Sequence, residues 1–218
     1  MSLMLFSHPF AAYCQKVLIA LYENDTPFVE RRLDGDHPDN GAEFARLWPV
    51  AKFPLLLDGD RPVLESTTII EYLQWRYPGP VRLIPDDPEA ALQVRMLDRV
   101  FDNHVMTNMQ RVVNDSLRPA ERRDAVEVAE AKAALDKAYG WLEQYLAGRE
   151  WAAGRFSLAD CAAAPSLFYA DWVNPIGDRF PVVAAYRARV LARPSVKRSV
   201  DEARPYRHFF PLGAPDRD

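Results

Sequence analysis

The fold is decided by residues 52–66, which read KFPLLLDGDRPVLES. Two short apolar runs flank an Asp-Gly pair, and this arrangement is a strong signal for a β-hairpin. Pro54 opens the first run, and an X-Pro bond can be cis at modest cost. Ser66 ends the stretch and is a candidate cap for a helix over residues 67–76. The stretch therefore predicts a hairpin followed directly by a helix.

The residues before this stretch alternate between strand and helix patterns. A buried strand is predicted over residues 3–6, a helix over 13–24 and a second strand over 28–33. This β-α-β unit implies a parallel pair of strands joined by a right-handed crossover. A polar loop over residues 34–41 and a short helix over 42–47 then lead to the hairpin. The resulting order, β-α-β-α-β-β-α, is that of a thioredoxin-like domain.

Beyond residue 78 the chain changes character. Prolines crowd residues 79–88, and closely spaced prolines can neither continue a helix nor pair as a central strand. We therefore expect an α/β domain over residues 1–78, a linker over 79–88, and an all-helical C-terminal domain over 89–218. Within the last of these, helices are predicted over residues 89–116, 125–146, 158–171 and 182–191.

The composition excludes several classes of protein. The 218 residues carry a net charge of −4 and no Lys/Arg block, so no surface offers the counterion release that nucleic-acid binding needs. The apolar start lacks a basic leader and is interrupted by polar residues, which argues against a signal peptide or a membrane span. Two cysteines, Cys14 and Cys161, are too few for a disulfide framework or a zinc site. We expect a cytoplasmic protein with no nucleic-acid, membrane or metal partner.

A thioredoxin-like domain, a proline-rich linker and a helical domain in this order resemble the cytosolic glutathione transferase family over essentially the whole chain. The resemblance implies that Phe53, before a cis Pro54, pairs with the cysteinyl backbone of glutathione. Ser66 and the first-turn N–H groups would hold the γ-glutamyl carboxylate, with Glu65 beside it. Lys52 would meet the glycine carboxylate or a nearby carbonyl. A strand-opening proline and a helix cap are each common structural features, but their spacing together favours a ligand site.

Two further segments resemble family features that concern folding. The run Ser157-Leu158-Ala159-Asp160 is similar to the capping box of a buried helix in the second domain. In such a box the serine oxygen accepts a first-turn N–H, and the acidic side chain reaches back to the serine N–H. The tail over residues 206–211, YRHFFP, resembles that of some bacterial members, and we expect it to pack against the core.

The segment that carries the reactive group in this superfamily departs from the pattern. In residues 11–17, AAYCQKV, Ala11 stands where glutaredoxins have cysteine and many bacterial transferases have serine. Alanine can neither attack nor donate a hydrogen bond. Tyr13 could offer its phenol or only pack against the peptide. Cys14 occupies the place of a resolving thiol, although an inert buried cysteine is the more common case. His8 could reach the sulfur site or lie in a surface loop. Tyr13 and Cys14 are thus the candidate catalytic residues.

The resemblance places an acceptor pocket between the domains, against the first long helix of the second. Phe101, His104 and Asn108 fall at helical spacing and could share one face toward this pocket, although such a stripe is more often core. The family forms homodimers about a two-fold axis, and we expect one here. Asp98 or Asp102 could then reach the γ-glutamyl amine of glutathione bound to the partner subunit.

Two functions stay open at this point. The first is a detoxifying transferase that adds the thiolate of glutathione to a small hydrophobic electrophile. The second is a fold relative that binds glutathione, or keeps only the scaffold, and acts through protein–protein contacts, as the stringent starvation protein does with RNA polymerase. Ala11 weakens the case for an enzyme. We favour the enzyme because a binding-only protein has less reason to keep the whole peptide site.

Overall fold

A four-stranded mixed sheet forms the first part of the chain, of which the computed structural model describes residues 3–218. The strand order is β2-β1-β3-β4, with β1 and β2 parallel and the other two pairs antiparallel. The predicted β-α-β unit, the hairpin and the element order are therefore confirmed. The elements are β1 (Leu3–Ser7), α1 (Ala12–Glu23), β2 (Val29–Arg32), α2 (Pro38–Leu47), β3 (Leu55–Asp58), β4 (Arg61–Leu64) and α3 (Ser66–Arg76).

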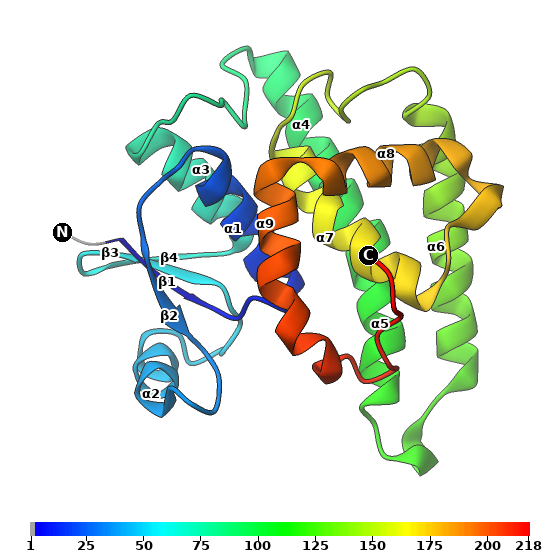
Figure 1. Cartoon of the computed structure of the whole chain (residues 1–218), viewed down its shortest axis with the longest axis horizontal. Helices are drawn as coiled ribbons and strands as arrows, with labels where there is room; N and C mark the ends of the chain where they lie inside the picture. The colour runs from blue at the N-terminus through cyan, green and yellow to red at the C-terminus, as the bar shows by residue number, and fades with distance from the viewer. Residues whose placement is uncertain (1–2) are drawn as a thin grey trace.

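Helices cover both faces of this sheet, with α1 and α3 on one side and α2 on the other (Figure 1). Leu5 and Leu56 face α1 and α3, whereas Phe6 and Leu55 pack against Phe44 of α2. Neighbouring residues point to opposite faces because side chains alternate along a strand. The helix α2 begins earlier than predicted, since its first residue is a proline, which suits the first helical position.

The second part is helical, as predicted, but differs in two places. The helix expected over residues 89–116 is divided by a π-helical segment, and a last helix, rich in polar residues, was not predicted. A proline occupies the first helical position of this last helix, which is a start signal. The elements are α4 (Pro88–Val100), the π segment (Phe101–Met106), α5 (Thr107–Ser116), α6 (Ala125–Tyr145), α7 (Leu158–Val173), α8 (Pro181–Ala192) and α9 (Pro194–Ala203), with 3₁₀ turns at Ala120–Arg122, Gly177–Arg179 and Arg204–Phe209.

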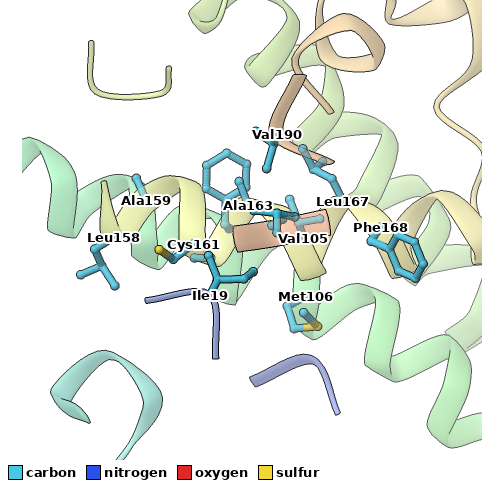
Figure 2. Close-up of a cluster of buried hydrophobic side chains, with 14 of the residues drawn as sticks. Ile19, Val105, Met106, Leu158, Ala159, Cys161, Ala163, Leu167, Phe168 and Val190 are labelled. Carbon is cyan, nitrogen blue, oxygen red and sulfur yellow. The ribbon is translucent and has the colours of Figure 1, made fainter. Parts of the chain in front are cut away.

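The helix α7 is the centre of the core that both parts share. It is buried along nearly its whole length, and Ile19 of α1 lies beside Cys161 and Ala163 of α7 (Figure 2). The predicted capping box starts this helix: Asp160 Oδ2 accepts the N–H of Ser157 at 2.9 Å. Because α1 carries one wall of the site described below, the shared core fixes that wall relative to the helical part.

The C-terminal tail packs only in part. Phe210 is buried and meets Trp172 with its ring edge-on, as expected of a tail that covers the core. Phe209 is mostly exposed, and the ring of Tyr206 meets that of His8 at 4.8 Å. No helix formed by residues 3–218 is long and apolar enough to cross a membrane.

Candidate functional site

A cavity of about 940 Å³ opens where the first part of the chain meets α4. The start of α1, the segment before β3, and the start of α3 form one side. The other side is formed by α4, the π segment and α5. All five residues that the resemblance assigned to glutathione line the cavity: Lys52, Phe53, Pro54, Glu65 and Ser66.

The segment before β3 presents free backbone groups at this cavity. The Phe53-Pro54 peptide bond is cis, as the resemblance implies. Within residues 3–218, the N–H and C=O of Phe53 make no hydrogen bond. An extended ligand lying along Phe53 can therefore pair with both groups, as a neighbouring strand would.

The start of α3 is uncapped and begins at a strained residue. Glu65 is the N-cap, with φ of 67°, a region that non-glycine residues enter at a cost of about 1–3 kcal/mol. Ser66 is therefore the first helical residue and not the cap, which corrects the sequence prediction. No side chain caps this helix, so the first-turn N–H groups face the cavity without an intrahelical partner. Such a helix start favours a bound carboxylate.

The start of α1 offers donors but no nucleophile. Ala11 is the N-cap and makes no side-chain hydrogen bond. Tyr13 lines the cavity, and its hydroxyl has no hydrogen-bond partner in the described part of the chain. Burial, reinforced by the negative charge of Asp102, raises the pKa of Tyr13 to about 12. The phenol therefore stays protonated at neutral pH and can donate a hydrogen bond to an anion.

The loop before α1 is fixed by a buried polar contact with α7. The amide of Gln15 donates to the carbonyl of Pro9 at 3.0 Å and to the hydroxyl of Tyr169 at 3.1 Å. The same hydroxyl donates to the carbonyl of Phe10 at 2.7 Å. Buried polar groups that satisfy one another in this way hold a single backbone arrangement. The donors at the start of α1 are thus held in place.

Two other candidates lie away from the cavity. Cys14 is fully buried and does not line it, and burial raises the pKa of Cys14 to about 12. A thiol in this state is not a nucleophile at neutral pH, so the structure argues against Cys14 as a catalytic residue. His8 accepts the N–H of Phe10 at 3.2 Å, and burial lowers its pKa. It stabilises the loop and does not reach the cavity.

The face predicted for an acceptor on the first long helix is not at this cavity. Phe101 is buried and stacks on Tyr186, His104 is exposed, and Asn108 donates to the carbonyl of His104. None of the three predicted residues lines the cavity. The π segment widens the helical turn, so residues three and four apart no longer share a face. The residues that do line this wall are polar: Arg95, Asp98, Arg99, Asp102, Asn103 and Gln110.

Beneath this wall lies a buried ionic cluster that sequence reasoning missed. Lys16 Nζ lies 2.5 Å from Asp98 Oδ1 and 2.8 Å from Asp102 Oδ2, and it donates to Thr67 Oγ1 at 3.0 Å. Arg99 bonds to both carboxylates. Burial raises the pKa of Asp102, and the charges of Lys16 and Arg99 oppose that shift. A lysine within the apolar run of α1 was the one available signal, since buried charges are usually paired.

The same contacts bear on the expected role of the acidic residues toward a partner subunit. Asp98 and Asp102 are both buried, and each carboxylate is held by Lys16 and Arg99 of its own chain. These contacts engage the two carboxylates within the chain, where they hold two cations at the wall of the cavity.

Two family models match the chain: the glutathione S-transferase N-terminal domain over residues 5–81 and the glutathione S-transferase C-terminal domain over residues 101–194. A probable maleylacetoacetate isomerase of Vibrio cholerae is 30% identical over 216 residues, which cover 94% of this chain and 98% of the relative. A stringent starvation protein A homolog of Coxiella burnetii is 29% identical and covers 91% of each chain.

Solved structures agree with these relatives. A glutathione S-transferase of Methylobacterium radiotolerans, in complex with glutathione sulfonate, has a TM-score of 0.78 and 28% identity, covering 92% of this chain and 95% of that one. One of Methylobacillus flagellatus, with GSH bound, has a TM-score of 0.79 and 25% identity, covering 91% and 98%. With both domains matched in order along a shared fold, the chain belongs to the glutathione S-transferase family.

Proposed function

We propose that this chain binds glutathione in the cavity and joins it, through its thiolate, to a small electrophile. The proposal rests on two backbone features that line the same cavity. The N–H and C=O of Phe53 make no hydrogen bond within the described residues, and the start of α3 at Ser66 has no side-chain cap. A γ-linked tripeptide has matching groups, because an amide lies at its centre and a carboxylate at its γ-glutamyl end. Lys52 supplies a cation for the carboxylate at the other end.

The donors at the start of α1 are suited to stabilise the thiolate. A free thiol with a pKa near ~8.5 is mostly protonated at neutral pH. A helix start contributes about 0.3–1 kcal/mol to an anion, and a hydrogen bond to a charged group about 1.5–3 kcal/mol. With the Tyr13 phenol as that donor, the two effects lower the thiol pKa by about 1–3 units. Ala11 contributes no side-chain donor, and its own N–H already donates to the carbonyl of His8 at 3.0 Å.

The reaction needs no thiol of the protein. The bound thiol releases its proton to solvent, and the electron pair of the thiolate forms a carbon–sulfur bond. With an aryl halide, the halide leaves with its bonding pair. With an activated double bond, the adjacent carbon takes a proton and the adduct is the product. If the thiolate instead leaves again after rotation about the former double bond, the double bond re-forms in the other geometry, which is the type of reaction that fits a relative named as an isomerase. Because Arg95, Asn103 and Gln110 line the far wall, the proposed electrophile combines an apolar body with polar groups.

We also propose a homodimer formed through α3 and α4. Trp75 of α3 is 70% exposed, and Leu92 and Met96 of α4 are 62% and 47% exposed. These faces adjoin, because Arg95 of α4 bonds to Glu71 of α3 at 2.8 Å. Large apolar side chains gathered on one face favour association. Sedimentation of the wild type as a dimer, and of Trp75→Glu as a monomer, would support this surface, and a monomeric wild type would contradict it.

Isothermal titration with glutathione tests the binding proposal. We expect saturable binding that Ser66→Ala weakens about 10-fold or more, because it removes a donor to a carboxylate. Ser116→Ala is the matched control, since Ser116 lies at the end of α5 and its hydroxyl bonds only to the carbonyl of Val113. Absence of heat from the wild-type protein would contradict glutathione binding.

A second function is favoured by Ala11 together with the relatives named stringent starvation protein A homologs. In that case the chain binds glutathione and a protein partner but does not join glutathione to an electrophile. Turnover of an aryl halide and of an activated alkene by the wild type supports the transferase. Turnover by Ala11→Ser alone would support the binding protein, because the variant restores only the missing hydroxyl donor.

A further inference from the structure

Arg99 has one edge fixed by the protein and one edge open to the cavity. Its Nε and Nη2 atoms donate to Asp98 Oδ2 at 3.0 and 2.6 Å, and Nη2 also donates to Asp102 Oδ2 at 2.7 Å. Nη1 makes no hydrogen bond among residues 3–218. The side chain is half exposed and lines the cavity. Two N–H donors of a guanidinium held in place are therefore available to a ligand.

The guanidinium of Arg99 also contacts the start of α3, through an atom of its fixed edge. Nη2 of Arg99 donates to Thr67 Oγ1 at 2.5 Å, and Thr67 follows Ser66 directly. A carboxylate bound by the first-turn N–H groups would therefore lie beside the guanidinium of Arg99. Arginine binds carboxylates well because its donors are planar and match the two oxygens.

The buried Lys16 balances the charge of the cluster that holds Arg99. Asp98 and Asp102 carry two negative charges, and Lys16 and Arg99 carry two positive charges. With Lys16 present the cluster is neutral, so an incoming carboxylate meets a free donor edge and no surplus of negative charge. Without Lys16 the same wall would carry a net negative charge and repel an anion.

We propose that Arg99 of the chain's own α4, fixed by Lys16, Asp98 and Asp102, binds the α-carboxylate of the γ-glutamyl group together with the start of α3. The inference rests on the proposed glutathione site and adds a residue that recognises one end of the ligand. In this arrangement the two aspartates position the arginine and do not touch the ligand.

The test compares two ligands on the same variant. Glutathione has the α-carboxylate, and 4-aminobutyryl-cysteinyl-glycine is the same peptide without it. We expect Arg99→Gln to weaken glutathione binding about 10- to 100-fold and to leave binding of the truncated peptide nearly unchanged. The matched control is Arg111→Gln on α5, whose side chain faces Glu127 and Glu130 outside the cavity.

The outcomes separate this inference from the function on which it rests. If Arg99→Gln lost equal affinity for both ligands, Arg99 would act only through the fold, and the inference would be overturned. Wild-type affinity of Arg99→Gln for glutathione, with Ser66→Ala weakened, would overturn it as well and leave the glutathione site standing. A wild-type protein that binds neither ligand would overturn the proposed function itself. Because each variant serves as its own reference, a partial loss of folded protein affects both ligands alike.

Discussion

Replacing Lys16 with methionine removes the ammonium group from the contact between the two parts of the chain. The Lys16 side chain is almost fully buried, and it lies within 2.8 Å of both Asp98 and Asp102. Methionine has a similar length, so the change removes the charge and leaves most of the packing. In the variant, Arg99 is the one cation among residues 3–218 that is left to balance the buried carboxylates of Asp98 and Asp102.

The expected effect is large because a buried charge loses its partner. Breaking a buried ion pair by removing one member costs about 3–5 kcal/mol. For a chain of 150–250 residues each kcal/mol lowers the melting temperature by about 2–4 °C. Lys16→Met should therefore melt about 6–20 °C below the wild type. Lys197→Met is the matched control, since Lys197 is exposed and pairs only with Asp201; it should cost less than about 1 kcal/mol.

The loss should also depend on pH. Burial already raises the pKa of Asp102, and Lys16 opposes that rise, so the variant raises it further. A carboxyl group whose pKa is higher in the folded state favours the folded state when it is protonated, so this stability is lost as the pH rises through the folded pKa. The loss in free energy of unfolding of Lys16→Met, relative to the wild type, should thus be largest near pH 8 and shrink toward about pH 5.

A double variant tests whether the charges act as a unit. Lys16→Met with Asp102→Asn leaves Asp98 balanced by Arg99, so the combined loss should be smaller than the sum of the single losses by about 1–3 kcal/mol. Thermal unfolding and urea denaturation of the four proteins measure this coupling. A Lys16→Met protein that melts within about 2 °C of the wild type, or strictly additive losses, would refute the reasoning.

Three other variants test separate parts of the account. Tyr13→Phe should lower turnover about 10- to 100-fold and raise the pKa of the bound thiol in a thiolate absorbance titration; an unchanged pKa would show that the phenol is not the donor. The thiol of Cys14, with its pKa raised to about 12, should resist alkylation at pH 7 in the native protein, and Cys14→Ala should keep its activity; rapid alkylation would contradict the burial. Asp160 accepts the N–H of Ser157 and of Ala152 and the hydroxyl of Tyr186, so Asp160→Ala should lose more than about 3 kcal/mol in urea denaturation; a loss below about 1 kcal/mol would mean that the helix start is stabilised elsewhere.

Features set by neighbouring residues could be predicted from the sequence. The Asp58-Gly59 pair forms the hairpin, with Gly59 at a positive φ of 61° that glycine adopts readily. The capping box at Ser157 and Asp160 needs only residues three apart. The five residues that the resemblance assigned to glutathione lie together at one cavity.

Features that depend on contacts between residues far apart in the sequence could not be predicted in this way. Lys16, Thr67 and Asp98 come from three helices that periodicity treats separately, yet their side chains bond to one another. The π segment changes which residues of the first long helix face the cavity, and the spacing of Phe101 and His104 gives no sign of it. Sequence periodicity assumes a regular helix, and part of the polar wall of the cavity lies where the helix is irregular.

The most direct test of the central claim is the electron density of a crystal soaked with glutathione. The account predicts the tripeptide along Phe53, its γ-glutamyl carboxylate at the first turn of α3 beside Ser66, and its sulfur within hydrogen-bond reach of the Tyr13 hydroxyl. A cavity that stays empty at saturating glutathione, or a tripeptide bound elsewhere on the protein, would contradict it.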